Sequence, residues 1–318
     1  MHGIRGEFGL NECLGCNVFY LSPRPALTAL STYYPEDYPQ HRYTKTDVRS
    51  VFLRGIRDML KNTIMYEIYK DKSYEYAKRI RSSVIAKFIS YLMFPFWKRA
   101  VLLPLFKEGA KVLDLGCGPG FYLFGLKNRG YEAYGIEPSD NAAKIGREQL
   151  GLNIKTGTIF DYKFPNNYFH LITMNSVLEH IHNPVEVLTE LKRILHPDGI
   201  ITIKTPNMDS FGYERFGKNW GPLETPRHLI LYSEKSLTNL CNLAGLQVKY
   251  FNTVHGIGLL YWSLAYETMA KKGIKEFSPN GTYSLFQKIQ INVLDLYERL
   301  LISMNKPIGE ELLAVLRK

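Results

Sequence analysis

The spacing of apolar and polar positions changes along the chain. From residue 108 to residue 251, short apolar runs alternate with longer stretches in which apolar residues recur every three or four positions. The short runs predict β-strands and the longer stretches predict amphipathic helices. Alternating strands and helices predict a parallel sheet with helices on both faces. The expected strands span 111–115, 132–136, 154–156, 170–174, 200–204 and 247–251, and the expected helices span 121–129, 139–150, a stretch that begins near 183, and 233–244.

Two segments within this region interrupt the alternation. Residues 196–199 read His-Pro-Asp-Gly, and this composition favours a turn. Residues 205–232 are polar and aromatic without a clear period, so a loop is expected there. Ser139 or Asp140 is expected to cap the second helix, because a short polar side chain can accept a hydrogen bond from the first helical turn.

The flanking regions predict further helices. Residues 44–82 and 83–106 carry apolar residues at helical spacing before the first strand, and residues 258–270 and 285–304 do so after the sixth. Residues 312–316 predict a final strand. The expected parts are an N-terminal segment 1–43, a basic helical region 44–107, and an α/β domain 108–318 with a helical insertion at 255–306.

Composition adds a charge asymmetry to this picture. Hydrophobic residues make up 45% of the chain and charged residues 22%, which argues against extended disorder. The net charge is +10, and residues 42–107 hold fifteen Lys or Arg against five Asp or Glu, which equals the whole excess. A basic segment attracts phosphate-bearing surfaces such as anionic lipids or nucleic acid, although a solvated helix face gives the same pattern.

Cysteine usage and hydropathy bear on the compartment. Four cysteines are too few for a disulfide framework and no secretory signal opens the chain, so we expect a cytoplasmic protein. The uncharged run 88–97 is too short to cross a bilayer. Cys13 and Cys16 offer two thiolates in a Cys-x-x-Cys turn, but a closed zinc site needs four ligands and only His2 and His41 lie nearby. We assign no metal ligands, and zinc at this turn stays an open alternative.

The candidate chemistry begins at residues 112–120, Val-Leu-Asp-Leu-Gly-Cys-Gly-Pro-Gly. The apolar residues predict a buried strand, and the glycines allow a sharp turn and close approach of the backbone to a ligand. A carboxylate at Asp114 repels a phosphate and attracts an ammonium or hydroxyl group. Phe121 replaces the third glycine of a dinucleotide fingerprint, which disfavours a dehydrogenase. A second acid, Glu137, ends the next strand, where either cofactor class would use one.

This glycine motif resembles the first motif of class I S-adenosylmethionine-dependent methyltransferases. The resemblance extends to Val-Leu-Glu-His-Ile at 177–181, to residues 191–199 and to Pro-Arg-His at 226–228. It includes bacterial enzymes of quinone and cell-envelope glycan biosynthesis, some of which begin with a zinc ribbon whose second knuckle resembles the Cys-x-x-Cys turn. On this resemblance, residues 1–43 are expected to be a degenerate or truncated zinc ribbon. The resemblance implies a Rossmann-like seven-stranded sheet of order 3-2-1-4-5-7-6, with the last strand antiparallel.

The same resemblance implies S-adenosylmethionine as the cofactor. The glycine turn would lie under the methionine part, Asp114 would hold the amino group, and Glu137 would bind the ribose. Residues that follow the second and third strands would flank the adenine. The implied cofactor-binding residues are Asp114, Gly116, Cys117, Gly118, Gly120, Glu137, Pro138, Thr158, Ile159 and Asn175.

Methyl transfer also requires that the acceptor is aligned and loses its proton. A histidine suits this role because its pKa lies near neutrality, and His228 is the first candidate and His180 the second. Either could instead be a structural histidine. Arg227 could grip a phosphate or carboxylate, and Trp220 could stack on a sugar or ring. Surface salt bridging and core packing are the respective alternatives.

We therefore expect a methyltransferase that acts at an oxygen of a sugar, glycan or lipid-linked small molecule, with polysaccharide biosynthesis as the favoured setting. Methylation of a quinone or phenolic ring at oxygen or carbon is an alternative. A non-catalytic module that binds nucleic acid is an alternative of another class, which the absence of a recognisable RNA-binding motif disfavours. Peripheral contact with an anionic membrane through 83–106 and 255–306 is a further hypothesis.

Overall fold

The computed structural model describes residues 8–26, 29, 32–33, 106–107, 109–273, 283–304 and 306–318. The helices predicted for 44–82 and 83–106 lie outside the described residues apart from residue 106. Most of the basic segment therefore lies outside them too.

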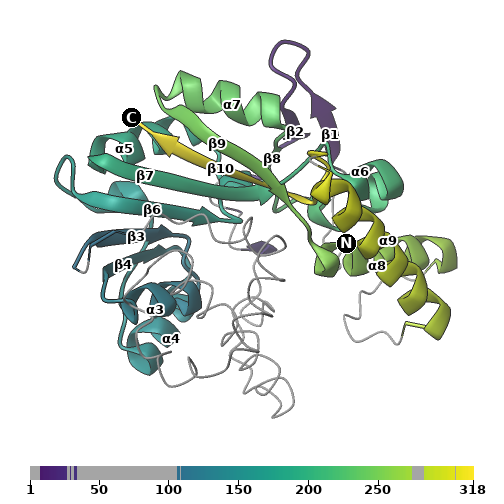
Figure 1. Ribbon diagram of the computed structural model, residues 1–318, viewed down its shortest axis with the longest axis horizontal. Coiled ribbons are helices and arrows are strands. Elements are labelled where there is room, and N and C mark those ends of the chain that lie inside the picture. Colours follow the sequence, from purple (N-terminus) through teal and green to yellow (C-terminus); the bar gives the residue numbers. More distant parts are fainter. Residues whose placement is uncertain are drawn as a thin grey trace, which may run out of the picture.

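Seven strands form a sheet at the centre of the described structure (Figure 1). In order across the sheet these are β5 (Asn153–Thr156), β4 (Glu132–Glu137), β3 (Lys111–Leu115), β6 (Phe169–Asn175), β7 (Leu195–Pro206), β10 (Glu311–Arg317) and β9 (Gln247–Val254). The first five are mutually parallel, and β10 lies antiparallel between β7 and β9. The predicted α/β class, the strand order and the antiparallel last strand are confirmed.

Helices cover the sheet and explain why its central strands are apolar at successive positions. Val112 and Leu113 point to opposite faces of β3, and both are fully buried. Two helices contact β4 or β5 and two contact β7 or β9 (Figure 1). These are α3 (Phe121–Lys127), α4 (Asp140–Leu150), α5 (Pro184–Ile194) and α7 (Glu234–Leu243). Ser139 caps α4 by accepting a hydrogen bond from Ala142 N at 3.3 Å.

Two sequence predictions were wrong in this region. The expected turn at 196–199 lies within β7, where the register with β6 shifts between Phe169 and Leu171, so these residues form an irregularity in the strand. The expected loop at 205–232 is largely structured. It contains α6 (Phe211–Phe216), two 3₁₀ turns, η6 (Gly217–Asn219) and η7 (Gly221–Leu223), and the short strand β8 (Ile230–Leu231). Contacts with residues distant in sequence hold it, and periodicity does not report such contacts.

The Cys-x-x-Cys turn lies in a small hairpin that the sequence did not predict. β1 (Gly9–Glu12) pairs antiparallel with β2 (Phe19–Ser22), and β2 pairs with β8. Cys13 N donates to Val18 O at 2.9 Å, which closes the turn. The hairpin is therefore attached to the structured segment 205–232.

The predicted insertion contains two long helices, α8 (Ile257–Lys272) and α9 (Leu285–Ser303), between β9 and β10. β9 runs parallel to β7 because both pair antiparallel with β10. The insertion therefore begins at the carboxyl end of β7 and the other parallel strands. Figure 1 shows α8 and α9 beyond that end of the sheet. Within the described ranges, every helix is too short or too polar to cross a bilayer.

Candidate active site

The glycine turn after β3 adopts a backbone that favours glycine. Gly116, Gly118 and Gly120 have φ values of +66°, +53° and +83°. The amides of Gly116 and Cys117 both donate to Ile136 O, at 2.8 and 3.2 Å, which fastens the turn to β4. The turn lies at the carboxyl end of a parallel strand, where open α/β sheets bind ligands.

The three glycines differ in what a side chain would meet. A Cβ on Gly116 would lie 2.5 Å from Val177 Cγ2, and one on Gly120 would lie 2.4 Å from Leu152 Cδ1. A Cβ on Gly118 would meet no atom within 4 Å among the described residues. Packing therefore accounts for the outer two glycines, whereas Gly118 leaves room for a ligand.

Two buried carboxylates flank this turn. Asp114 is 3% exposed, and its Oδ1 accepts a hydrogen bond from Thr173 Oγ1 at 2.5 Å. Burial raises the pKa of Asp114 to about 7; the nearby Glu137 adds to the rise and the Thr173 hydroxyl opposes it. Glu137 accepts from Gly118 N at 2.8 Å and from Ser139 N at 2.9 Å. A cationic ligand would stabilise the ionised form of Asp114.

The other predicted cofactor residues lie at the carboxyl ends of the parallel strands or in the segments that follow them. Pro138, Thr158 and Asn175 are exposed, Cys117 is half-buried, and Ile159 is buried. Sequence reasoning missed Asp161, whose Oδ2 accepts from both the amide and the hydroxyl of Thr158, at 2.6 and 2.8 Å. The signal was present, because an acid three residues after a threonine is a capping-box pattern.

A short segment connects the glycine turn to the predicted histidines. Val177, which faces Gly116, accepts a hydrogen bond from His180 N through its carbonyl at 3.0 Å. His180 belongs to the 3₁₀ turn η5 (Leu178–His180), and Glu179 O in that turn accepts from Leu229 N at 2.7 Å. The structure therefore brings the segment that contains His228 next to the cofactor-side turn.

His228 is buried and ion-paired. Its Nδ1 lies 2.5 Å from Pro222 O, and its Nε2 lies 3.2 Å from Glu224 Oε2. Both partners are acceptors, so both ring nitrogens carry protons in this arrangement. Burial lowers the pKa of His228, but hydrogen bonding and charge attraction from Glu224 outweigh it and the pKa is raised. His228 is therefore held as a cation, which does not suit a general base.

His180 lies beside it in the opposite protonation state. The two rings are 4.6 Å apart and edge-on, and His180 Nδ1 lies 3.0 Å from Arg227 O. Burial lowers the pKa of His180 to about 3, and the positive charge of His228 adds to the effect. A proton on Nδ1 that is donated to the carbonyl leaves the ring lone pair on Nε2.

Arg227 and Trp220 are both occupied by internal contacts. Arg227 is 3% exposed, and its Nη2 donates to Glu224 Oε1 at 2.6 Å. Trp220 is fully buried, and its Nε1 donates to Glu310 Oε2 at 2.6 Å. The structure thus places both side chains in the interior. Trp220 packs in the core, which was its alternative role, whereas the ion pair of Arg227 is buried and is not the surface salt bridge that was the alternative for that residue.

Two groups of side chains near the predicted site residues or in the hairpin offer metal ligands. Glu179, His180 and His228 offer ligand atoms within 4.8 Å of one another. A metal requires unprotonated imidazoles, and the contacts of His228 favour the protonated ring, so we assign no metal there. Cys13 and Cys16 are half-buried thiols, and no further His, Cys, Asp or Glu of the described chain completes a three-ligand group with them.

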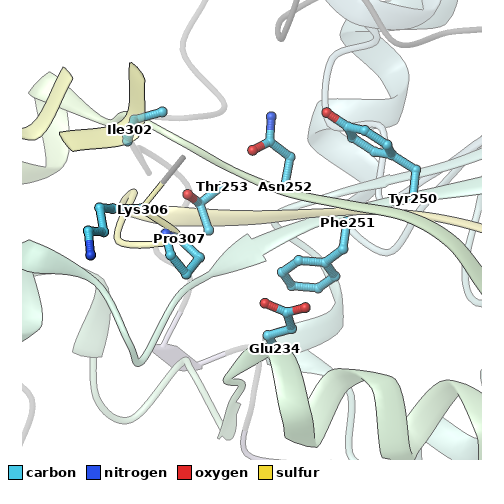
Figure 2. A pocket seen from close by; sticks show the side chains of 8 residues that line it. All are labelled: Glu234, Tyr250, Phe251, Asn252, Thr253, Ile302, Lys306 and Pro307. Carbon is cyan, nitrogen blue, oxygen red and sulfur yellow. The ribbon is translucent and has the colours of Figure 1, made fainter. Parts of the chain in front are cut away.

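A cleft of about 270 Å³ lies apart from these residues. Figure 2 shows that it is formed by β9, the start of α7, the end of α9 and the residues that follow α9. Its lining includes Asn252, Thr253, Lys306 and Pro307 but none of the predicted site residues. It is not the candidate active site.

Comparison with known proteins agrees with the geometry. Residues 85–250 match the family model described as a methyltransferase domain. The chain belongs to the methyltransferase domain family. It contains a domain of S-adenosylmethionine-dependent methyltransferases, and the open backbone at Gly118 between two carboxylates fits that cofactor. Membership of this family argues against the alternative of a non-catalytic module that binds nucleic acid.

Individual relatives match over part of their length. An uncharacterised methyltransferase of Schizosaccharomyces pombe is 32% identical over 122 residues, which are 34% of this chain and 44% of the relative. The ubiquinone biosynthesis O-methyltransferase of an Azoarcus species is 27% identical over 155 residues, 44% of this chain and 65% of the relative. The chain thus spans less than two thirds of these two curated relatives.

Solved methyltransferases resemble the chain more distantly. An S-adenosylmethionine-dependent methyltransferase from Archaeoglobus fulgidus is 18% identical with a TM-score of 0.46, and the match covers 72% of this chain and 94% of that one. Phosphoethanolamine N-methyltransferase 2 of Haemonchus contortus, in complex with S-adenosylmethionine, is 14% identical with a TM-score of 0.45, over 70% of this chain and 52% of that one. The fold assignment rests on the strand order described above.

Proposed function

We propose that this methyltransferase transfers a methyl group to an oxygen of a lipid-linked small molecule. The proposal has a donor part and an acceptor part. The donor part rests on the open glycine turn between Asp114 and Glu137. The acceptor part rests on the exposed apolar face of α9. A sugar or glycan on a lipid carrier and a prenylated quinone or phenolic ring both meet this description, and relatives named as ubiquinone biosynthesis O-methyltransferases favour the ring.

Each residue at the turn is proposed to bind a different part of S-adenosylmethionine. S-adenosylmethionine supplies an electrophilic methyl group on a positively charged sulfur. Asp114 is proposed to bind the ammonium group, because it is a buried carboxylate with few competing donors. Each oxygen of Glu137 accepts one backbone amide and retains a lone pair for a ribose hydroxyl. Ile159 is proposed to pack on the adenine.

His180 replaces His228 as the proposed base. His180 is the neutral imidazole of the pair, so its ring keeps a lone pair that can accept a proton. Its pKa of about 3 makes it a weak base, so its proposed role is to take the acceptor's proton only as the methyl group is transferred. Glu224 and Pro222 O hold His228 protonated, and its charge helps to keep His180 neutral. His228 and Arg227 are thus proposed as positioning residues that act through His180.

The α9 face supports a membrane-associated acceptor. Its large apolar side chains recur at helical spacing and remain exposed in the described structure, with Leu285 and Phe286 both 75% exposed. A helix with an apolar face and basic neighbours is suited to the headgroup region of an anionic membrane. The exposed residues are Leu285, Phe286, Ile289, Val293, Leu296, Tyr297 and Leu300. This arrangement is consistent with a cytoplasmic enzyme that contacts the inner face of a membrane peripherally.

Calorimetry tests the donor site. The wild-type chain is expected to bind S-adenosylmethionine, and Asp114→Ala is expected to weaken binding about 30-fold or more, because a charge-assisted contact of about 2 kcal/mol is lost. Asp198→Ala is the matched control, since the Asp198 side chain is 93% exposed and lies on the surface. Binding that is unchanged in Asp114→Ala would contradict the assignment.

Isotope transfer tests the acceptor. Purified enzyme and methyl-labelled S-adenosylmethionine are incubated with a lipid extract, or with the water-soluble metabolites, of the cells that naturally contain the enzyme. Label is expected in the lipid fraction, and mass spectrometry of the labelled lipid distinguishes a sugar from an aromatic ring. Label confined to the aqueous fraction would rule out a lipid-linked acceptor.

The His180→Ala variant separates a base from a binding residue. It is expected to lower kcat at least about a hundredfold while the affinity for S-adenosylmethionine stays within about twofold of wild type. A loss of cofactor affinity equal to the loss of rate would assign His180 to the donor site instead.

A further inference from the structure

The corner between β9 and the helical insertion gathers three side chains that bind metals. His255 follows β9 and precedes α8, whereas Asp295 and Glu298 lie on α9. Asp295 and Glu298 are three positions apart, so they share one face of the helix. None of the three takes part in the donor site or in the proposed base.

The spacing of the three side chains suits a single ion. Each offers one ligand atom, and these atoms lie within 4.8 Å of one another. His255 Nδ1 is 3.8 Å from Asp295 Oδ1. Two ligands on one ion, each bound at about 2.1 Å, lie roughly 3–4 Å apart. Small rotations of the side chains would therefore bring the three ligand atoms onto one ion.

Two buried carboxylate oxygens point to a missing partner. Glu298 is fully buried and Asp295 is 8% exposed. Within the described part of the chain, Glu298 Oε2 and Asp295 Oδ1 have no hydrogen-bond partner. Their companion oxygens are satisfied, because Glu298 Oε1 accepts from Glu310 N at 3.2 Å and Asp295 Oδ2 accepts from Arg299 Nε at 2.8 Å. Buried carboxylate oxygens without a hydrogen bond are rare, and the His255 ring, at 3.8 Å from Asp295 Oδ1, is too far away to supply one. A bound cation is one explanation.

We propose that His255, Asp295 and Glu298 bind a first-row transition-metal dication such as Mn²⁺ or Zn²⁺. The imidazole ligand favours Zn²⁺ over Mg²⁺ and Ca²⁺, and the two carboxylates also suit Mn²⁺. The His255 side chain is 38% exposed, so the remaining coordination positions can be taken by water from that side. The site requires neither the methyl donor nor the acceptor.

The bound ion would fix the insertion to the rest of the enzyme. It would join the end of β9 to the middle of α9. Glu298 already bonds the amide of Glu310, whose carboxylate holds Trp220 Nε1 and Gly212 N, each at 2.6 Å. Metal binding would therefore order the insertion and the structured segment 205–232 together, as a structural ion.

Electron paramagnetic resonance with Mn²⁺ tests the site on the full chain. Wild-type protein is expected to bind one Mn²⁺. Glu298→Gln is expected to abolish this binding, and His255→Ala is expected to lower the affinity at least tenfold. His196→Ala is the matched control, because the His196 side chain is similarly exposed at 34% and lies on β7. It is expected to bind Mn²⁺ like wild type.

Further variants separate this site from other metal ligands. Cys13→Ser with Cys16→Ser is expected to keep the Mn²⁺ signal, and a loss of signal there would place the ion at the hairpin. Circular dichroism verifies that each variant is folded. If Glu298→Gln fails to fold, His255→Ala decides the outcome, since that side chain is partly exposed. Equal binding by wild type and His255→Ala, or no binding of Mn²⁺ or Zn²⁺ by folded wild type, would overturn the proposal.

Discussion

Lowering the pH below 7 is expected to weaken the binding of S-adenosylmethionine through Asp114. Burial raises the pKa of this carboxyl group to about 7 in the chain without ligand, and the charge of Glu137 adds to the rise. The ammonium group of the cofactor needs the ionised carboxylate. Protonation of Asp114 therefore competes with binding, and affinity must fall as the pH drops through this pKa.

The size of the effect follows from the ionised fraction. With a pKa of about 7, Asp114 is about half ionised at pH 7 and about one-eleventh ionised at pH 6. The dissociation constant should rise about fivefold over that unit, or about 1 kcal/mol in binding free energy. About half a proton should be released on binding at pH 7, and about 0.9 at pH 6.

Isothermal titration calorimetry measures both quantities. Titrations at pH 6 and pH 7 give the affinities, and two buffers of different ionisation enthalpy at each pH give the protons released. Asp114→Asn should bind weakly at both pH values, without the fivefold dependence, because its amide does not titrate. A wild-type affinity that changes less than twofold, or an Asp114→Asn variant that keeps the full dependence, would refute the reasoning.

Two further predictions concern the turn and the ion pair. Gly116→Ala should lower the free energy of unfolding in urea by at least about 2 kcal/mol, since it adds a clash with Val177 to the strain of a positive φ. Gly118→Ala, with open space around it, should cost only about 1–2 kcal/mol, and equal losses would contradict this account. Glu224→Gln should lower the pKa of His228, observable by NMR titration, because the variant loses the carboxylate that opposes the effect of burial. In wild type the pKa of His228 is raised, so its ion pair stabilises the fold fully below pH 6.5 and progressively less as the pH rises through the folded pKa. If Glu224→Gln is as stable as wild type at pH 6, the pairing is refuted.

The sheet was predictable from sequence because its signals are local. Residues 111–115 form the predicted first strand without change, and the strand order followed from the resemblance to known methyltransferases. The segment 205–232 was not predictable in this way. Trp220 Nε1 bonds Glu310, and Gly221 N bonds Ser263 Oγ at 2.8 Å, so distant residues set its conformation.

The candidate site was predictable in position but not in protonation. Asp114 and Glu137 lie at the glycine turn, where the motif put them. The choice between the two histidines depended on burial and on the partners of each ring nitrogen. Sequence shows that Glu224 lies four residues before His228, but not that Pro222 O takes the other nitrogen.

The position of β10 has a consequence for synthesis on the ribosome. β7 and β9 are both translated before β10, yet neither pairs with the other and each uses β10 as a neighbour. Until residues 311–317 emerge, the two strand edges that β10 later joins, one on β7 and one on β9, therefore face no partner. Such edges are sites of aggregation, so a chain that stalls within the insertion should depend on chaperones more than one that stalls after β10.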